Sequence, residues 1–102
     1  MAKTPLMTAE KLEEALGILP RAPYAYTPTP LEECPRLSQA LGGPRILIKR
    51  DDLTGLAFGG NKARHMEFRI GDAIAKGCDM IINTNHWVSN NARFIAAACA
   101  KV

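Results

Sequence analysis

The sequence predicts an α/β protein, the start of a parallel sheet covered by helices. Two observations carry this prediction: a short apolar strand, a loop and an amphipathic helix occur in that order, and the same order then repeats. Buried strands are expected at 46–48 and 79–84, and helices at 62–76 and from about 90. Two strands cannot make such a sheet stable and the last helix ends inside an apolar pattern, so we expect the chain to continue.

An amino-terminal unit is expected over residues 1–30. It begins with a short helix over 8–17, which Thr8 can cap and along which leucine and alanine recur at helical spacing. Four prolines then predict an extended segment from Pro20 to Pro30. Its aromatic residues suggest packing against the rest of the protein.

Residues 31–102 form the predicted α/β region. It opens with a second short helix, which begins at Pro35 and is stopped by Gly42 and Gly43. We expect most of the charged residues near its loops to have structural rather than catalytic roles. Local pairing is expected for Lys49, Arg50, Asp51 and Asp52, and a solvated helix face for Arg64 and Arg69.

The composition is that of an ordinary globular protein and excludes several function classes. Apolar residues make up 47% of the 102 residues, which argues against disorder. The net charge is +3 with the two signs interleaved, so neither a nucleic-acid surface nor a membrane patch is predicted. The three cysteines are far apart and no leader or membrane-spanning run is evident, so we expect a cytoplasmic protein with reduced thiols.

The glycine-rich loop from Gly55 to Asn61 is the most informative feature. Glycines allow a sharp turn and close backbone approach to a ligand, and here they deliver Lys62 to the start of a helix. The positive end of the helix dipole disfavours an ammonium ion there, and a lysine that forms a Schiff base must first be neutral. Taken alone, the pattern also fits an exposed lysine after a turn.

A nucleotide-binding loop is an alternative for the same segment. Gly55 and Gly60 have the spacing of the phosphate-binding pattern G-x-x-x-x-G-K-[ST]. However, Asn61 stands where that pattern needs its lysine, and Ala63 follows Lys62 in place of a magnesium-binding hydroxyl. The sequence therefore favours a Schiff-base lysine over a nucleotide-binding module.

Ser89, Asn90 and Asn91 stand where a polar loop meets the last predicted helix. Free backbone N–H groups at a helix start bind anions, and a substrate carboxylate is a natural one. Ser and Asn are also preferred capping residues, so capping alone is the simpler interpretation on local grounds.

Together, these segments resemble one enzyme family. The stretch KRDDLTGLAFGGNK at 49–62, with TPTPLEECPRLSQALGG before it and SNNAR after it, is similar to the 1-aminocyclopropane-1-carboxylate deaminase and D-cysteine desulfhydrase family. That family lies within the tryptophan-synthase-β-like, fold type II pyridoxal-phosphate enzymes. The similarity runs from about Thr27 to Val102. It implies a three-layer αβα fold with a parallel sheet, incomplete in this chain, and pyridoxal 5′-phosphate as cofactor.

The resemblance implies roles for five residues. Lys62 resembles the Schiff-base lysine, which also moves a substrate proton, and Asn61 would steady the loop beside it. Ser89 resembles an active-site serine that contacts the substrate carboxylate and has been proposed as nucleophile or base. Asn90 resembles the asparagine that hydrogen-bonds the phenolic oxygen of the cofactor, and Asn91 lies where the family has a residue near the substrate carboxylate. A homo-oligomer is also implied.

The loop over 85–88 departs from the family pattern. The family usually has a Gly-Gly or Gly-Ala pair, then an apolar residue and Gln, where this sequence has NHWV. The added bulk puts the usual substrates in doubt more than the cofactor. We expect His86 to be an exposed loop residue, Trp87 to pack in the core and His65 to lie at the surface. With two histidines and no ligand cluster, no metal site is predicted.

The sequence thus predicts a pyridoxal-phosphate-dependent lyase or deaminase that converts a small amino acid to a 2-oxo acid and ammonia. Members of the resembled family are much longer, and no residue here can be assigned to the cofactor phosphate or the pyridine nitrogen. The alternative is therefore a non-catalytic, truncated fragment of such an enzyme. From the 102 residues alone we expect weak cofactor binding and no useful turnover.

Overall fold

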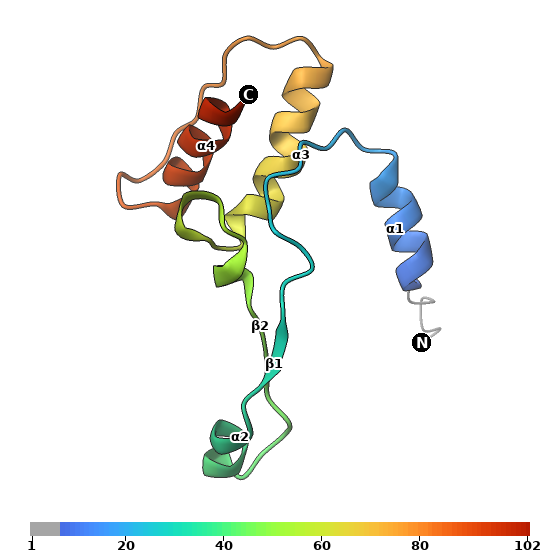
Figure 1. Ribbon diagram of the computed structural model, residues 1–102, viewed down its shortest axis with the longest axis vertical. Coiled ribbons are helices and arrows are strands. Elements are labelled where there is room, and N and C mark those ends of the chain that lie inside the picture. The colour runs from blue at the N-terminus through green and yellow to red at the C-terminus, as the bar shows by residue number, and fades with distance from the viewer. Residues whose placement is uncertain (1–6) are drawn as a thin grey trace, which may run out of the picture.

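Two helices, α3 (Lys62–Ala75) and α4 (Asn90–Lys101), form the centre of the computed structural model, which describes residues 7–102. They pack side by side and run in the same direction, so their amino-terminal ends lie together (Figure 1). The first six residues of the predicted 1–30 unit lie outside the described part. The core between the helices and the extended segment comprises Tyr24, Ala63, Met66, Ile70, Phe94 and Ala98.

Helix α3 forms where the apolar spacing predicts a helix, and it ends one residue earlier than expected. Met66 and Ile70 are at most 1% exposed, and burying each such side chain contributes roughly 1.5–3 kcal/mol. Gly71 lowers the helix propensity of this stretch, but it has a packing role. A Cβ built there would lie 2.6 Å from the carbonyl oxygen of Pro20, so glycine lets the extended segment cross the helix closely.

The extended segment over 20–30 is tied to α3 by one buried carboxylate. Glu67 is 1% exposed, and it accepts hydrogen bonds from the backbone N–H of Tyr24 (2.9 Å) and Ala25 (2.7 Å) and from the guanidinium of Arg21 (2.6 Å). Burial alone would raise the pKa of Glu67, but these donors lower it below its ordinary value of 4.5. The carboxylate therefore stays ionised and holds the segment. Of the two tyrosines expected to pack against the rest of the protein, Tyr24 lies in the core and Tyr26 is 75% exposed.

The strands β1 (Leu31–Glu33) and β2 (Leu47–Lys49) pair in an antiparallel two-stranded ribbon, with α2 (Pro35–Leu41) between them. Helix α2 begins at Pro35 and ends at a left-handed Gly42, both as predicted. The strand predicted at 46–48 forms one residue later, and its partner among the described residues is β1, an antiparallel strand that was not predicted, rather than a parallel neighbour. The register places Leu31 opposite Lys49, Glu32 opposite Ile48 and Glu33 opposite Leu47.

The prediction that this strand is buried is wrong for the described chain. All residues of both strands are exposed, because nothing among residues 7–102 covers either face of the ribbon. Arg50 follows β2 and pairs with Glu32 (2.8 Å) and with Asp52 (2.7 Å), so the expected local pairing is confirmed there.

The strand predicted over 79–84 is also wrong for the described residues. This segment is irregular, and Met80 and Ile82 are 72% and 87% exposed. An extended segment becomes a strand only when a neighbour completes its hydrogen-bond ladder, and no such neighbour lies within the described chain. The apolar pattern indicates a segment suited to a strand, but it cannot supply the partner.

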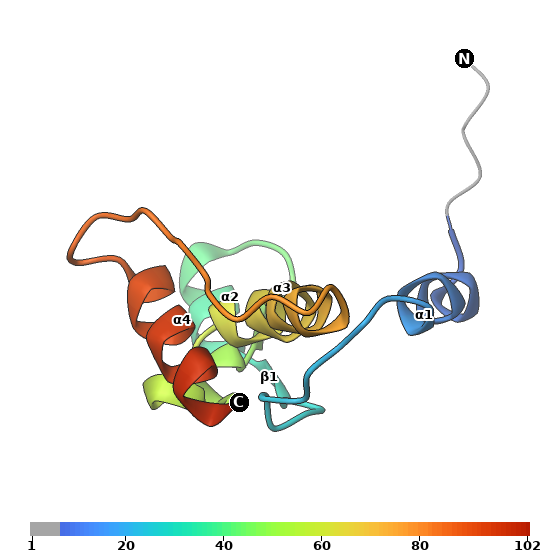
Figure 2. The same ribbon diagram turned by 90° about the horizontal axis from the view of Figure 1, so that it is seen from above.

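Helix α1 (Ala9–Gly17) stands apart from the other helices (Figures 1 and 2). Its start is as predicted: the Thr8 hydroxyl accepts a hydrogen bond from the N–H of Lys11. None of its residues is buried.

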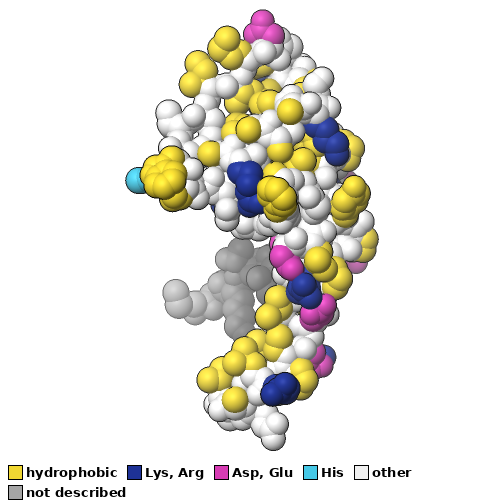
Figure 3. Space-filling view, turned by 60° about the vertical axis from the view of Figure 1, so that its left-hand side comes forward, with side chains coloured by type: hydrophobic (Ala, Val, Ile, Leu, Met, Phe, Trp, Pro, Cys, Tyr) yellow, Lys and Arg dark blue, Asp and Glu magenta, His cyan; other side chains and the backbone are white. Residues whose placement is uncertain are grey.

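Hydrophobic side chains are spread over the face of the molecule that Figure 3 shows. The radius of gyration is 17.3 Å, against about 13 Å for a compact domain of this size. No helix among residues 7–102 is long and apolar enough to cross a membrane.

Replacing Glu67 tests how the extended segment is held. Glu67→Gln is expected to lower the free energy of unfolding by about 1.5–3 kcal/mol at neutral pH, because charge-assisted hydrogen bonds are weakened. The pKa of Glu67 is lowered in the folded state, so its contribution is complete above pH 4.5 and is lost as the pH falls through the lower folded value.

Urea unfolding at several pH values, with amide hydrogen exchange at Tyr24 and Ala25, measures this effect. Glu13→Gln on the exposed helix α1 is the matched control and should change neither quantity. Equal behaviour of the two variants would contradict the assigned role of Glu67.

Candidate active site

The loop that leads to Lys62 is closed by one buried hydroxyl. Thr54 is fully buried, and its Oγ1 accepts a hydrogen bond from the N–H of Gly60 (2.9 Å) and donates to the Gly60 carbonyl (2.8 Å). The same N–H also lies 2.8 Å from the carbonyl oxygen of Asp51. These bonds satisfy the N–H and the carbonyl of Gly60 and bring this residue back against the start of the loop. Lys62 therefore leaves the loop in a fixed direction.

The loop before Lys62 has a stretch of left-handed backbone, which explains its need for glycine at position 59. It comprises the short 3₁₀ helices η1 (Asp51–Leu53) and η2 (Leu56–Phe58), and positive φ angles run from Ala57 to Gly60. At Gly59 (φ 79°) a Cβ would lie 1.8 Å from the carbonyl oxygen of Asp52, so no larger residue fits. Ala57 and Phe58 carry side chains at φ 48° and 69°, a conformation that costs non-glycine residues of order 1 kcal/mol or more.

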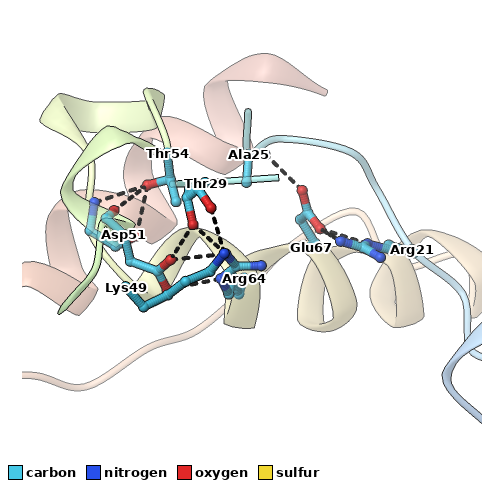
Figure 4. Close-up of polar contacts among 9 residues, drawn as sticks. Arg21, Ala25, Thr29, Lys49, Asp51, Thr54, Arg64 and Glu67 are labelled. Carbon is cyan, nitrogen blue, oxygen red and sulfur yellow. Dashed lines mark hydrogen bonds and ion pairs between the residues drawn. The ribbon is translucent and has the colours of Figure 1, made fainter. Parts of the chain in front are cut away.

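An ion-pair network anchors the loop to the first turn of α3 (Figure 4). Arg64 donates to both carboxylate oxygens of Asp51 at 2.9 Å and to the hydroxyl of Thr29 at 3.0 Å. Hydrogen bonds from Arg64 lower the pKa of Asp51 from 3.8 to about 2. Lys49 donates to the carbonyl of Thr29. Arg64 is half-buried, so its predicted solvated position is wrong: Asp51, brought back by the loop, covers that helix face.

Lys62 is the first residue of α3 and is half-buried. Within residues 7–102 its amine makes neither an ion pair nor a hydrogen bond, so it is available to react with an aldehyde. Asn61 precedes it and is exposed; its carbonyl accepts a hydrogen bond from the N–H of Arg64 at 3.2 Å. In the described residues the side-chain bonds that fix the loop come from Thr54, Arg64 and Arg93.

The start of α4 presents the second group of predicted residues. Ser89 caps the helix, with its Oγ accepting from the N–H of Asn91 at 3.2 Å, so its hydroxyl proton is left to donate. The Asn90 Oδ1 accepts from Arg93 at 3.2 Å, and its NH₂ has no partner in the described chain. The Asn91 amide donates to Asn85 at 2.9 Å, which ties the preceding loop to the helix.

The structure brings the two groups to the same end of the helix pair. A Cβ at Gly60 would lie 3.2 Å from a ring carbon of Phe94, so the lysine loop packs directly against α4. Arg93 of α4 also donates to the carbonyl of Ala57 in η2. The amino-terminal ends of α3 and α4 carry partial positive charge, and both face this end of the pair. An amine, an amide donor, a hydroxyl and helix-start N–H groups suit an anionic aldehyde cofactor and an amino-acid carboxylate.

The loop over 85–88 lies open. Trp87 is 92% exposed, so the prediction that it packs in the core is wrong; the loop projects beyond the helices, and no described element covers it. His86 and His65 are exposed as predicted. Among residues 7–102, no group of three His, Cys, Asp or Glu side chains could hold a metal ion.

An apolar hollow of about 550 Å³ lies elsewhere, between the carboxyl-terminal parts of α3 and α4. Ile74, Met80, Cys99 and Val102 are among the residues that line it. It contains neither Lys62 nor the start of α4. The hollow is therefore separate from the candidate site.

An α/β scaffold with a glycine loop that presents a lysine at a helix start is typical of pyridoxal-phosphate enzymes. A comparison with family models agrees: the model described as pyridoxal-phosphate dependent enzyme matches residues 22–102. The chain belongs to this family. The predicted resemblance is thereby confirmed, and the family's cofactor is pyridoxal phosphate.

Individual relatives place the chain more closely. It is 48% identical over 84 residues to 1-aminocyclopropane-1-carboxylate deaminase from Rhizobium leguminosarum bv. viciae, covering 80% of this chain and 25% of the relative. It is 48% identical over 83 residues to D-cysteine desulfhydrase from Salmonella typhimurium, covering 81% and 25%. The chain spans about a quarter of the length of these curated relatives.

A solved structure confirms the fold class. The crystal structure of an ACC deaminase homologue superposes with a TM-score of 0.84 at 39% identity, covering 93% of this chain and 29% of that one. The chain therefore has the fold of one part of a larger α/β enzyme. The nucleotide-binding alternative gains no support, because η1 rather than a strand leads into Gly55.

Two residues of the site, Thr54 and Arg93, were not identified from the sequence. A threonine directly before the first glycine of the loop is a weak signal for a side chain that closes it. An arginine one turn into a helix carries no signal of its own, because its contacts come from a loop more than 30 residues earlier in the chain.

Thr54→Val removes the hydroxyl and keeps the shape of the side chain. It should lower the free energy of unfolding by about 1–3 kcal/mol, because the half-buried N–H and carbonyl of Gly60 each lose their bond to the hydroxyl, and it should speed hydrogen exchange at the Gly60 amide. Thr54→Ser should retain most of the stability. Urea unfolding and hydrogen exchange measure these effects, with exposed Thr84→Val as control; a Thr54→Val variant as stable as that control would refute the closing role.

Proposed function

We propose that this chain forms part of a pyridoxal-phosphate-dependent lyase or deaminase that acts on a small amino acid, with Lys62 as the lysine that holds the cofactor. The observation that carries the proposal is the Lys62 amine, fixed by the Thr54-closed loop and without an ion pair in the described residues. Family membership supports the cofactor.

Each residue of the candidate site has a task in this proposal. When bound, the cofactor withdraws electrons from the substrate carbon next to the amino group. The Lys62 amine holds the cofactor and, once released by the substrate amine, moves a proton at that carbon. The Asn90 NH₂ donates to the cofactor's phenolic oxygen. Ser89 and Asn91, with the N–H groups at the start of α4, bind the substrate carboxylate, and Asn61 supports the lysine.

The names of the relatives suggest the candidate substrates. One is named for 1-aminocyclopropane-1-carboxylate and the other for D-cysteine, and the corresponding products are 2-oxobutanoate, or sulfide with pyruvate, each with ammonia. The bond between Asn85 and Asn91 uses one of the two N–H donors of the Asn91 amide, leaves the other for the substrate, and orders one end of the 85–88 loop. A substrate other than these two would follow if this loop narrows the site, and product analysis distinguishes the cases.

We also propose a compartment and an assembly state for this protein. Cys34, Cys78 and Cys99 are all unpaired, which suits a reducing compartment such as the cytoplasm. A homo-oligomer is proposed from the family resemblance. Because the chain spans about a quarter of its relatives, we propose that these 102 residues alone bind the cofactor weakly and turn over no substrate.

Borohydride reduction tests the cofactor role directly. In the full protein that carries these residues, reduction followed by peptide mapping should find a pyridoxyl-phosphate mass on the peptide containing Lys62. Lys62→Ala should lose the adduct and the visible absorbance of bound cofactor, since no other amine replaces it.

Lys76→Ala is the matched control, because Lys76 lies at the other end of α3 and, within residues 7–102, pairs only with Asp72. This control should keep the adduct. An adduct on another lysine, or none in the unaltered protein, would contradict the proposed function.

A further inference from the structure

Arg93, in the first turn of α4, joins two parts of the proposed site that the chain connects only through the length of α3 and the following loop. Its guanidinium donates to the carbonyl of Ala57 in η2 and, at 3.2 Å, to Oδ1 of Asn90. One side chain thus contacts both the loop that carries Lys62 and the asparagine at the opposite side of the site.

Two aromatic rings fix where the guanidinium lies. Its central carbon is 5.0 Å from the ring centroid of Phe94 and 5.8 Å from that of Phe58, both within the range of cation–π attraction. Phe94 is fully buried and also abuts Gly60. The position of Arg93 is therefore set by the core on one side and by the loop on the other.

The bond from Arg93 also decides which way the Asn90 amide is turned. A guanidinium only donates hydrogen bonds, so the amide oxygen of Asn90 must face Arg93 and the NH₂ must face away. That NH₂ has no partner among the described residues. A phenolic oxygen on the cofactor accepts hydrogen bonds, so only this orientation of Asn90 can bind it. With the amide turned over, two donors would face each other across 3.2 Å.

We propose that Arg93 is a positioning residue: held on the lysine loop by its bond to Ala57, it orients Asn90 toward the cofactor. The proposal rests on the proposed function, because it takes Lys62 and Asn90 as cofactor contacts. Arg93 itself acts through Asn90 and touches no reacting atom.

A double-mutant cycle tests the proposal in the full protein that carries these residues. Arg93→Lys keeps a cation beside both phenylalanines but loses the planar fork that reaches Ala57 and Asn90 together. Titration of the apoprotein with pyridoxal 5′-phosphate should show about tenfold weaker binding for Arg93→Lys and for Asn90→Ala, since each loses the same oriented hydrogen bond.

The double variant should bind the cofactor no more than about twofold more weakly than Asn90→Ala alone, because Arg93 acts through that residue. Arg69→Lys is the control: Arg69 is exposed on α3 and has no side-chain bond in the part of the chain that the structure describes. It should leave cofactor affinity unchanged.

Effects that multiply in the double variant would overturn the proposal, because Arg93 would then act independently of Asn90. Unchanged affinity in Arg93→Lys would also overturn it, while the borohydride adduct on Lys62 would remain. Absence of that adduct in the unaltered protein overturns the proposed function and this inference together. Thermal unfolding of each variant, expected to match that of Arg69→Lys within a few degrees, separates positioning from a general loss of fold.

Discussion

The buried hydroxyl of Thr54 fixes the loop on which the candidate site depends. The left-handed backbone from Ala57 to Gly60 is costly, and it persists because Thr54 holds both the N–H and the carbonyl of Gly60. Asp51 and Arg64 then join the loop to the first turn of α3. Without these bonds the chain before Lys62 would have no single direction, and the amine could not be presented to a ligand.

Helix α3 is the element through which the rest of the described chain is organised. One side packs against α4, and another binds the extended segment through Arg64 and Glu67, three residues and one turn apart. Gly71 lets the same segment cross closely. Thus a carboxylate, a guanidinium and a missing side chain position residues 20–30, while the amino-terminal end of the helix carries the lysine.

Local signals in the sequence predicted what local physics decides. Thr8, Pro35, Gly42 and Ser89 mark helix boundaries because capping and φ preferences act within a few residues. The glycine loop and its lysine were found for the same reason. Whether 79–84 pairs as a strand, how exposed β2 and Trp87 are, and what Arg64 and Arg93 contact depend on residues distant in sequence. Periodicity and composition therefore could not predict that 79–84 is irregular and that β2 and Trp87 are exposed in the described chain. The family resemblance supplied roles for Asn90 and Asn91 that their local pattern alone did not distinguish from capping.

The starts of α3 and α4 bring a lysine and an asparagine together, and we propose that these two residues hold one cofactor. A crystal structure of the full protein with pyridoxal 5′-phosphate tests this most directly. We expect continuous density from Nζ of Lys62 to the cofactor. The Asn90 NH₂ should lie within about 3 Å of the phenolic oxygen, and the Asn90 Oδ1 should still accept a hydrogen bond from Arg93. A cofactor bound away from Lys62, or an Asn90 amide turned from it toward another partner, would contradict the account.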